Sequence, residues 1–508
     1  MEKNQNDSIG ATTLPLMLFA VFAILRLILA IRMPLIPDEA YYWDWTRFLS
    51  PGYFDHPPMV AWVAAAGTAV FGDTLLGVHA GPLLLGAGSW ILTLLFCRQF
   101  CRDKLTLALV LIMMNGTALF GVTHFLLTPD APQAFFWAAA LLTGYHALFK
   151  QQSIPVWLLL GVIAGLGLLS KYTFALFLIS MAVYLIANSS GRKFLTRPHP
   201  YIAFLACLVT YSPNLIWNAQ NNWIAVGFQL GHGLRGKGGI RFDYLGDYLA
   251  GQAGLLGLFL FIFLIMASIR IIRHERDNPR LMYLFTFYAA PYAFFTLSSL
   301  AKRVEANWPG PAHIAAFVTI GWFFEKMRAE NAIKRTRFII ASIGFSALLI
   351  GLILFHILFP VLPLPSGIDM TKQARGWDQL GQDVAKAITE KYPSIQKPVC
   401  ANRYQETSLL GFHMPDNPRT WALNLNSRAN HYSLLEKRVQ AMQDTLFYVY
   451  RLSRNLELSP SIRSKFEFLH TIDTVFLNRP PHAPRPYGVY IGRLHPQAVK
   501  DATWQEPQ

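Results

Sequence analysis

Long apolar stretches recur along the first 360 residues and alternate with short polar loops. Each stretch approaches the roughly 20 apolar residues that a helix needs to cross a bilayer. The pattern predicts eleven spans, or up to thirteen, and the two on either side of Lys171 are short and tightly joined. The predicted spans are 12–33, 75–97, 105–125, 132–149, 155–169, 172–188, 201–218, 248–270, 281–300, 311–328 and 338–360.

The pattern changes near residue 361, within a proline-rich linker at residues 360–365. Residues 377–392 place apolar side chains on one face, which is typical of an amphipathic helix. Residues 444–450 and 487–491 are rich in aromatic and β-branched residues, which favours strands. We therefore expect a transmembrane domain over residues 1–360 and a small α/β domain over residues 361–508.

Composition narrows the class of protein. Hydrophobic residues make up 53% of the 508 residues and charged residues only 14%, whereas about a quarter of an average chain is charged. These charges are too few to cover the surfaces of several soluble domains. A soluble multidomain protein, a disordered chain and a fibrous chain are therefore excluded, and a polytopic α-helical membrane protein remains.

The net charge of +15 helps to identify the binding partners of the chain and its orientation in the membrane. Basic residues gather in alternate loops, near residues 98–104, 192–197, 270–280 and 326–337, as expected for cytoplasmic loops beside anionic lipid. The charge thus indicates membrane lipids rather than nucleic acid as a partner. With a cytoplasmic N-terminus, eleven spans place residues 361–508 outside, which is the periplasm if the protein lies in a bacterial inner membrane.

The first outside loop, residues 34–58, concentrates acidic and aromatic side chains. Pro37 suits a helix start, and the two acids after it fall in the first turn, where the helix dipole favours carboxylates. Helix capping and an aromatic belt in the membrane interface explain part of this pattern, but not a second acid–histidine pair further along the loop. The candidate site residues of this loop are Asp38, Glu39, Tyr41, Tyr42, Asp55 and His56.

The other outside loops carry ionisable residues that also have structural explanations. An acid just before a helix can cap it, a lysine between apolar helices can snorkel, and the glycine-rich residues 229–241 can be a solvated loop or a phosphate cradle. Two cations within residues 302–309 oppose the positive-inside bias, which favours anion binding there. The candidates are Asp130, Lys171, His232, Arg235, Arg241, Lys302, Arg303, Glu305 and Asn307.

Acids, aromatic rings and cations are thus expected to gather on the outer side of an apolar bundle. Acids suit deprotonation of a nucleophile or metal binding, and aromatic rings suit sugars. Cations at the membrane surface suit a phosphate whose tail lies in lipid. Nucleotide sugars are absent outside the cytoplasm, so the combination indicates an enzyme that takes a sugar from a lipid-phosphate donor.

Five motifs resemble the glycosyltransferase-C superfamily, specifically the family of protein mannosyltransferases and aminoarabinose lipid A transferases. They are residues 37–42 (Pro-Asp-Glu-Ala-Tyr-Tyr), 53–58 (Tyr-Phe-Asp-His-Pro-Pro), 128–130 (Thr-Pro-Asp), 170–172 (Ser-Lys-Tyr) and 302–309 (Lys-Arg-Val-Glu-Ala-Asn-Trp-Pro). The resemblance covers about residues 12–330. It implies a polyprenyl-phosphate sugar donor, a catalytic aspartate in the first outside loop and a C-terminal domain outside.

One motif departs from the family. Aminoarabinose transferases carry a Glu-Lys pair where this chain has Asp55 and His56, and histidine is a weaker, pH-dependent cation than lysine. The identity of the sugar therefore stays open. No cofactor is certain, and a divalent metal ion on Asp55 and His56 is the one candidate.

The resulting hypothesis is a bacterial inner-membrane glycosyltransferase acting on a lipid A, envelope-glycan or protein acceptor. Asp38 would orient or deprotonate the acceptor, and Glu39 and Asp55 would assist it or hold a metal ion. The phosphate would be bound by Lys171, Lys302 and Arg303. A transporter or flippase of lipid-linked sugars is the alternative, although transporters usually place polar residues at the bilayer midplane and carry internal repeats. An envelope scaffold would not need the clustered acids.

Overall fold

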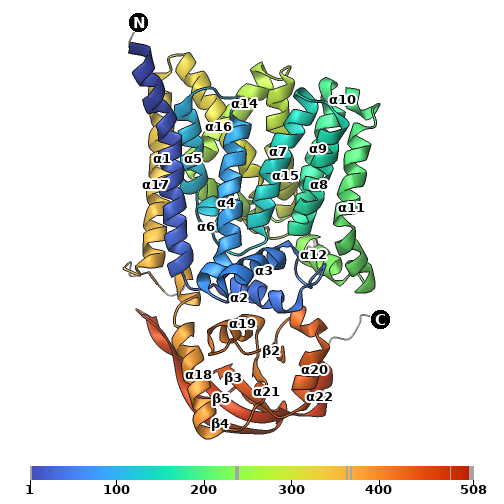
Figure 1. Cartoon of the computed structure of the whole chain (residues 1–508), viewed down its shortest axis with the longest axis vertical. Coiled ribbons are helices and arrows are strands. Elements are labelled where there is room, and N and C mark those ends of the chain that lie inside the picture. Colours follow the sequence, from blue (N-terminus) through green and yellow to red (C-terminus); the bar gives the residue numbers. More distant parts are fainter. Residues whose placement is uncertain (1–2, 235–238, 362–363, 366–368, 481, 503–508) are drawn as a thin grey trace. The chain divides into compact units, whose positions relative to one another are not determined.

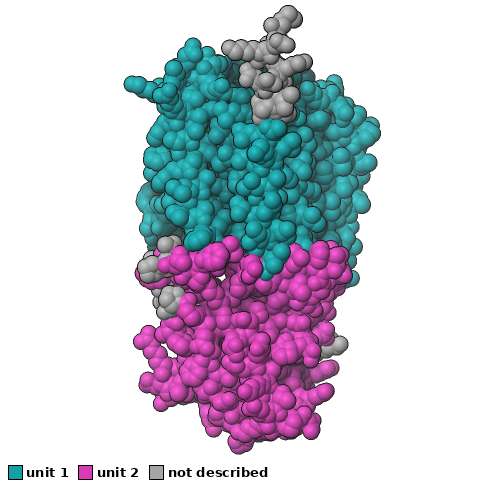
Figure 2. All heavy atoms as spheres, turned by 60° about the vertical axis from the view of Figure 1, so that its left-hand side comes forward, with its two compact units in different colours: residues 1–31, 56–63, 79–355 teal, residues 32–55, 64–78, 356–508 magenta. Residues whose placement is uncertain are grey.

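The computed structural model describes residues 3–234, 239–361, 364–365, 369–480 and 482–502 (Figure 1). The fold is predominantly helical, with a five-stranded sheet in the C-terminal part. The chain divides into two compact units (Figure 2). Unit 1 comprises residues 1–31, 56–63 and 79–355, and unit 2 comprises residues 32–55, 64–78 and 356–508.

Apolar helices build unit 1, and each predicted span coincides with one helix or with two successive helices. The helices are α1 (Lys3–Arg32), α4 (Leu75–Cys97), α5 (Lys104–Gly116), α6 (Ala118–Thr123), α7 (Asp130–Phe149), α8 (Ile154–Ser170), η2 (Tyr172–Phe174), α9 (Ala175–Ala187), α10 (Ser189–Leu195), α11 (His199–Gln220), α12 (Ile224–Leu234), α13 (Phe242–Leu256), α14 (Leu258–His274), α15 (Pro279–Ser299), α16 (Ala312–Ala329) and α17 (Ile333–Leu358).

Helix length and hydropathy support the membrane assignment. Within the described residues, five helices are individually long and apolar enough to cross a bilayer, namely α1, α4, α11, α15 and α17. Two bent combinations, residues 172–195 and 242–274, would each add one span, which gives up to seven by length and composition alone. The chain is a polytopic α-helical membrane protein, as the sequence predicts.

Several local breaks differ from the prediction. The stretch predicted as one helix over 248–270 starts earlier and bends by 101° between α13 and α14. Gly257 makes this bend with a φ of 92°, and an added Cβ there would lie 2.7 Å from Ser346 Oγ. The stretch over 105–125 divides between α5 and α6, and residues 229–234 of the expected glycine-rich loop are helical in α12. The short apolar helix α3 (Met59–Phe71) was not predicted.

Small residues let the helices of unit 1 approach closely. A Cβ added at Gly161 of α8 would lie 2.1 Å from the Ala203 carbonyl oxygen of α11. Close backbone contact of this kind replaces the hydrophobic driving force that is missing between helices in lipid. The chain also buries Arg26 of α1, whose guanidinium donates to Asn115 Oδ1 of α5 at 3.3 Å.

Unit 2 contains a mixed sheet with the strand order β2-β1-β3-β5-β4. Strands β2, β1 and β3 are parallel, whereas β5 is antiparallel to both β3 and β4. The predicted amphipathic helix is α18 (Trp377–Lys391), which buries Leu380, Val384 and Ile388. The elements are β1 (Val399–Ala401), β2 (Thr420–Ala422), β3 (Leu446–Arg451), β4 (Phe466–Arg479), β5 (His482–Leu494), η3 (Met370–Gln373), η4 (His431–Leu434), α19 (Tyr404–His413), α20 (Glu436–Gln443), α21 (Pro460–Arg463) and α22 (Pro496–Ala502).

Residues 34–55 of the first predicted outside loop belong to unit 2 together with the C-terminal segment. They form α2 (Pro37–Asp44) and η1 (Trp45–Phe48), and α2 packs against α19. The aromatic residues of this segment, for which an interfacial belt was one explanation, are largely buried by protein: Tyr41 lies 4.4 Å from Tyr404 between ring centroids. Interfacial aromatic belts and protein-packed aromatic faces have the same sequence pattern, so the pattern could not separate them.

Candidate functional site

Helix α2 presents two adjacent acids with opposite surroundings. Pro37 occupies the first helical position, and Asp38 and Glu39 follow it in the first turn. The Glu39 carboxylate is fully buried and accepts a hydrogen bond from the Ile36 backbone N–H at 3.0 Å. Glu39 therefore ties the start of α2 in place, as a capping glutamate does. Its predicted catalytic role stays a prediction.

Asp38 is exposed to solvent, unlike the other acids of this loop. Its Oδ1 accepts a hydrogen bond from the Tyr404 hydroxyl at 3.2 Å. The surrounding protein desolvates the carboxyl group and raises its pKa above the usual range, although the bond from Tyr404 opposes this shift. A raised pKa favours proton acceptance near neutral pH. Asp38 thus combines exposure to solvent with a raised pKa, two properties that suit a general base.

Asp55 is buried and holds two partners. Its Oδ2 accepts a hydrogen bond from the Tyr41 hydroxyl at 2.6 Å, and its Oδ1 pairs with Arg428 Nη1 at 2.7 Å. The Arg428 guanidinium also lies 5.2 Å from the centre of the Tyr404 ring. Asp55 therefore connects the first outside loop to the residues of the C-terminal segment that contact Asp38.

Aromatic rings enclose this cluster. Trp45 stacks on Tyr53 with ring centroids 4.1 Å apart, and the Tyr42 ring lies 5.0 Å from Trp45. His431 packs edge-on against Tyr53, and burial lowers its pKa to about 3, which keeps the ring neutral. The His431 backbone N–H donates to the Tyr41 hydroxyl at 2.7 Å. The rings thus fix the Tyr41 hydroxyl against Asp55.

Buried amide side chains hold the segment that carries Arg428. Asn402 follows β1, and its Oδ1 accepts from the Leu425 backbone N–H at 3.1 Å. Asn424 follows β2 and exchanges hydrogen bonds with Asn430, the shorter at 2.9 Å. Asn424 adopts a φ of 56°, a left-handed conformation that asparagine tolerates. Arg428 therefore sits on a segment whose polar core is internally satisfied, and such networks rigidify.

Sequence reasoning missed Tyr404 and Arg428. They lie more than 360 residues from Asp38 and Asp55 along the chain, so no local spacing connects them. A weaker signal was available, because both follow short strands. In open α/β sheets, ligand-binding side chains gather outside the carboxyl ends of parallel strands. The polar run from Asn424 to Asn430 is such a segment.

The structure adds no further ligands to the metal site predicted on Asp55 and His56. The parts of the chain that the structure describes contain no group of three or more His, Cys, Asp and Glu side chains arranged to hold a metal ion. Both carboxylate oxygens of Asp55 contact Tyr41 and Arg428, and the half-buried His56 falls in unit 1. A metal ion on Asp55 and His56 stays a prediction.

Unit 1 brings three predicted residues together. Lys171 lies in an extended break between α8 and η2, and its Nζ donates to Asp130 Oδ1 at 2.7 Å. Asn307 Nδ2 donates to Asp130 Oδ2 at 3.4 Å. Both charged side chains are largely buried. The Asp130 side chain therefore binds Lys171 and Asn307. Helix capping was the other explanation for this acid, but α7 has no side-chain hydrogen bond at its N-cap.

The remaining cations of unit 1 have different surroundings. Lys302 is buried, its Nζ lies 5.0 Å from the centre of the Trp308 ring, and burial lowers its pKa. Arg303 and Glu305 are exposed. Arg241 pairs with Asp243 two residues on, at 2.6 Å. Arg235 and the side chain of His232 lie outside the described residues.

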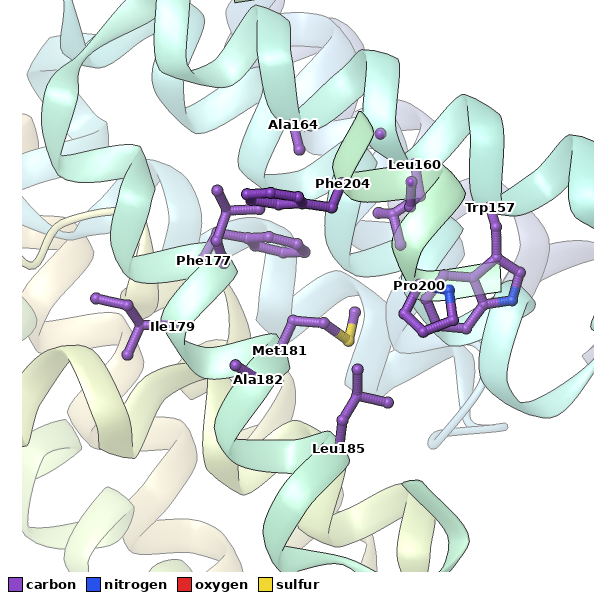
Figure 3. Close-up of a pocket in the computed structure, with 13 residues that line it drawn as sticks. Trp157, Leu160, Ala164, Phe177, Ile179, Met181, Ala182, Leu185, Pro200 and Phe204 are labelled. Carbon is purple, nitrogen blue, oxygen red and sulfur yellow. The ribbon is translucent and has the colours of Figure 1, made fainter. Parts of the chain in front are cut away.

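An apolar cavity of about 340 Å³ lies among α8, α9 and α11 (Figure 3). Trp157 and Phe204 line it, together with Phe177 and Met181. Its lining is almost entirely hydrocarbon and aromatic, so it suits a lipid chain rather than a polar ligand.

Comparison with known proteins finds similarity in sequence to transferases. Residues 55–217 match the family described as dolichyl-phosphate-mannose-protein mannosyltransferase, a range that begins after Asp38 and Glu39. A lipid A galacturonosyltransferase, RgtD, of Rhizobium johnstonii is 27% identical over 371 residues, which cover 70% of this chain and 72% of the relative. An undecaprenyl phosphate-alpha-4-amino-4-deoxy-L-arabinose arabinosyl transferase of Pseudomonas aeruginosa is 33% identical over 153 residues. The match covers 27% of this chain and only 28% of that relative.

Solved structures match over nearly the whole chain. ArnT from Cupriavidus metallidurans in the apo state has a TM-score of 0.63 at 15% identity, covering 98% of this chain and all of that chain. The same protein bound to undecaprenyl phosphate has a TM-score of 0.61 at 14% identity. At this level of identity the likeness concerns the fold. The predicted glycosyltransferase-C fold and the resemblance to this group of transferases are confirmed.

Proposed function

We propose that the chain, a membrane glycosyltransferase with the glycosyltransferase-C fold, moves one sugar from an undecaprenyl-phosphate donor to lipid A in the periplasm. Its relatives support the substrates: one is a lipid A galacturonosyltransferase and another an undecaprenyl-phosphate aminoarabinose transferase. A protein of the same fold was solved with undecaprenyl phosphate bound. These relatives favour a lipid acceptor over a glycan or a protein, and the sugar stays open.

The exposure of Asp38 is the observation that carries the catalytic assignment. Glu39, Asp44 and Asp55 are each less than 5% exposed, whereas Asp38 is exposed. A general base must reach the proton that it abstracts. Among the described acids of residues 32–55, only Asp38 meets that condition. Glu39 and Asp55 support it as positioning residues, through the start of α2 and through Arg428.

The proposed reaction is a direct displacement. An acceptor hydroxyl attacks the anomeric carbon of the sugar, and Asp38 takes the hydroxyl proton as the new C–O bond forms. The bond between the anomeric carbon and the phosphate oxygen breaks, and polyprenyl phosphate leaves with the bonding electrons. Displacement in one step inverts the configuration at the anomeric carbon.

Cations of unit 1 are proposed to bind the donor phosphate. Lys171, Lys302 and Arg303 supply positive charge that stabilises the leaving phosphate. Asp130 holds Lys171 in one orientation, and the Trp308 ring supports Lys302. The apolar cavity among α8, α9 and α11 (Figure 3) suits an isoprenoid chain. Each residue is a separate proposal that mutagenesis can test.

The proposed orientation in the membrane predicts which parts of the chain are accessible from the periplasm. We propose that residues 1–360 form the membrane domain and residues 361–508 a periplasmic domain. A cysteine introduced at the exposed Ser453 should react with a membrane-impermeant maleimide in intact cells, and one at the exposed Asp277 should not. The four native cysteines are all buried, so they give little background. If the cysteine at position 277 reacts and the cysteine at position 453 does not, the proposed orientation is wrong.

Mass spectrometry of envelope lipids tests the proposed function in cells. We expect lipid A of the parent strain to carry one sugar that is absent from a strain lacking the gene. The wild-type gene should restore the sugar, and the Asp38→Asn variant at equal protein level should not. Identical lipid A in the parent and the deletion strain would refute lipid A as the acceptor.

A further inference from the structure

Unit 2 contains a cavity of about 650 Å³ whose lining includes five lysine and arginine side chains. It lies where β3 ends and where β4 turns into β5, and its lining includes neither Asp38 nor the residues that contact Asp38 and Asp55. None of the motifs described above includes it. Its ionisable lining residues are Lys372, Arg451, Arg454, Arg479, His482 and Arg485.

The strand register places two of these arginines on one face. Arg451 of β3 pairs with Tyr487 of β5, and Arg485 precedes Tyr487 by two residues. Because side chains alternate between the faces of a strand, Arg451 and Arg485 are diagonal neighbours on the same face. Burial lowers the pKa of the Arg485 guanidinium, and the nearby charge of Arg451 lowers it further. The two cations therefore repel each other.

The positive charge is not balanced by ion pairs. Among the described residues, no carboxylate lies within 4 Å of Arg451, Arg479 or Arg485 in an ion pair. Glu406 of α19 acts on Arg485 only electrostatically and accepts a hydrogen bond from Tyr487 at 3.4 Å. Asp369 likewise acts on Arg479 without pairing with it, so nearby carboxylates offset the repulsion among the cations only in part, and the remainder costs free energy. A bound anion would remove that cost.

Arg479 provides a second indication of a ligand. It is only 4% exposed, and its Nη1 donates to the Lys372 carbonyl at 3.1 Å. Its Nε is buried and has no hydrogen-bond partner among the described residues. Buried donors are rarely left unpaired, and each one costs about 1–3 kcal/mol. Arg479 therefore stands in the cavity wall with hydrogen-bonding capacity that the described residues do not use.

Contacts within unit 2 connect the cavity wall to the last turn of α17. Asp369 Oδ2 contacts His482 Nε2 at 2.9 Å in the cavity wall. Asp369 Oδ1 lies 3.7 Å from Nε2 of His356, which belongs to the last turn of α17. Burial opposes ionisation of Asp369, but hydrogen bonds from Thr371 and His482 outweigh it and lower the pKa to about 2. Helix α17 is long and apolar enough to cross a bilayer, and the chain enters unit 2 from its last turn.

We propose that this arginine cavity binds the phosphate groups of the acceptor lipid headgroup. Phosphate oxygens accept the forked hydrogen bonds that arginine donates, and a headgroup is the phosphate source at the end of a span. An uncharged glycan would not relieve the repulsion among the cations. The assignment of the headgroup to the acceptor rests on the proposed function, whereas phosphate binding does not.

Lipid binding to the purified full chain in non-ionic detergent tests the proposal. The probes are bisphosphorylated lipid A, the same lipid without phosphates, and phosphatidylglycerol, and native mass spectrometry measures the lipid-bound fraction. We expect the Arg451→Gln/Arg485→Gln variant to bind bisphosphorylated lipid A about ten- to a hundred-fold more weakly than wild type. Arg493→Gln is the matched control on β5, because Arg493 is exposed and lies outside the cavity.

Each outcome decides a separate point. Equal binding of bisphosphorylated lipid A by wild type and the double variant would overturn the proposal, as would equal binding of lipid A with and without phosphates. Equally strong, cavity-dependent binding of phosphatidylglycerol would overturn the acceptor as the source of the phosphate. If the glutamine variant does not fold, Arg451→Lys/Arg485→Lys keeps the charge and should show weaker binding through loss of the forked hydrogen bonds. Because no assay here requires sugar transfer, failure of the proposed function would leave these results interpretable.

Discussion

Replacing Asp38 with Asn should lower sugar transfer by about 10²–10⁴-fold, the usual contribution of a positioned general base. Asparagine has nearly the same size and keeps an oxygen that can accept the hydrogen bond from Tyr404. Glu39 rather than Asp38 ties the start of α2, so the helix should form normally. The variant therefore removes proton acceptance and little else.

The measurement is turnover of labelled sugar from a purified polyprenyl-phosphate donor, at matched protein concentration. Asp378→Asn is the control, because Asp378 is also an exposed acid in the first turn of a helix of unit 2. It should retain wild-type turnover. Desolvation raises the pKa of Asp38, so wild-type activity should fall on acidification at a higher pH than an ordinary aspartate would give. Near-wild-type turnover of Asp38→Asn would remove Asp38 from the catalytic role.

Replacing Lys171 with Met should destabilise unit 1 and impair donor use together. The variant leaves the Asp130 carboxylate buried with Asn307 as a weak partner at 3.4 Å. Breaking a buried ion pair from one side costs about 3–5 kcal/mol. Thermal unfolding in detergent measures this loss, and Lys334→Met, at an exposed lysine of α17, should show none.

A double variant separates the structural role of Lys171 from phosphate binding. Lys171→Met/Asp130→Leu removes both charges, which is often neutral for stability. We expect this variant to regain stability but to use the donor about ten- to a hundred-fold less well, because a charge-assisted contact to phosphate is lost. Wild-type donor use by the stable double variant would show that the ion pair serves structure alone.

The membrane fold was predictable because hydropathy is a local property of the chain. Apolar stretches of about 20 residues identify spans without knowledge of their neighbours, and α18 followed from its own periodicity. The bend at Gly257 was not predictable in this way, since a single glycine barely changes the mean hydropathy of a long apolar stretch. Its cause is a backbone conformation with positive φ against Ser346, which depends on packing with another helix.

The site was predictable only in part, for the same reason. The type and order of the polar residues indicated acids and cations outside the membrane, and the structure joins Lys171 to Asp130 and Asp55 to Tyr41. Sequence could not separate the exposed Asp38 from the buried Glu39, because neighbouring residues of a helix point in different directions. Arg428 was missed because its contact with Asp55 spans 373 residues.

Reconstitution of the reaction tests the central claim most directly. The purified chain, in liposomes with lipid A and an undecaprenyl-phosphate-linked sugar, should increase the mass of lipid A by one sugar residue and release undecaprenyl phosphate. Aminoarabinose is the first donor to try, followed by other sugars on the same lipid. Asp38→Asn should give little of either product. Movement of the donor across the bilayer with no gain in the mass of lipid A, for every sugar tried, would contradict the account and favour a transporter.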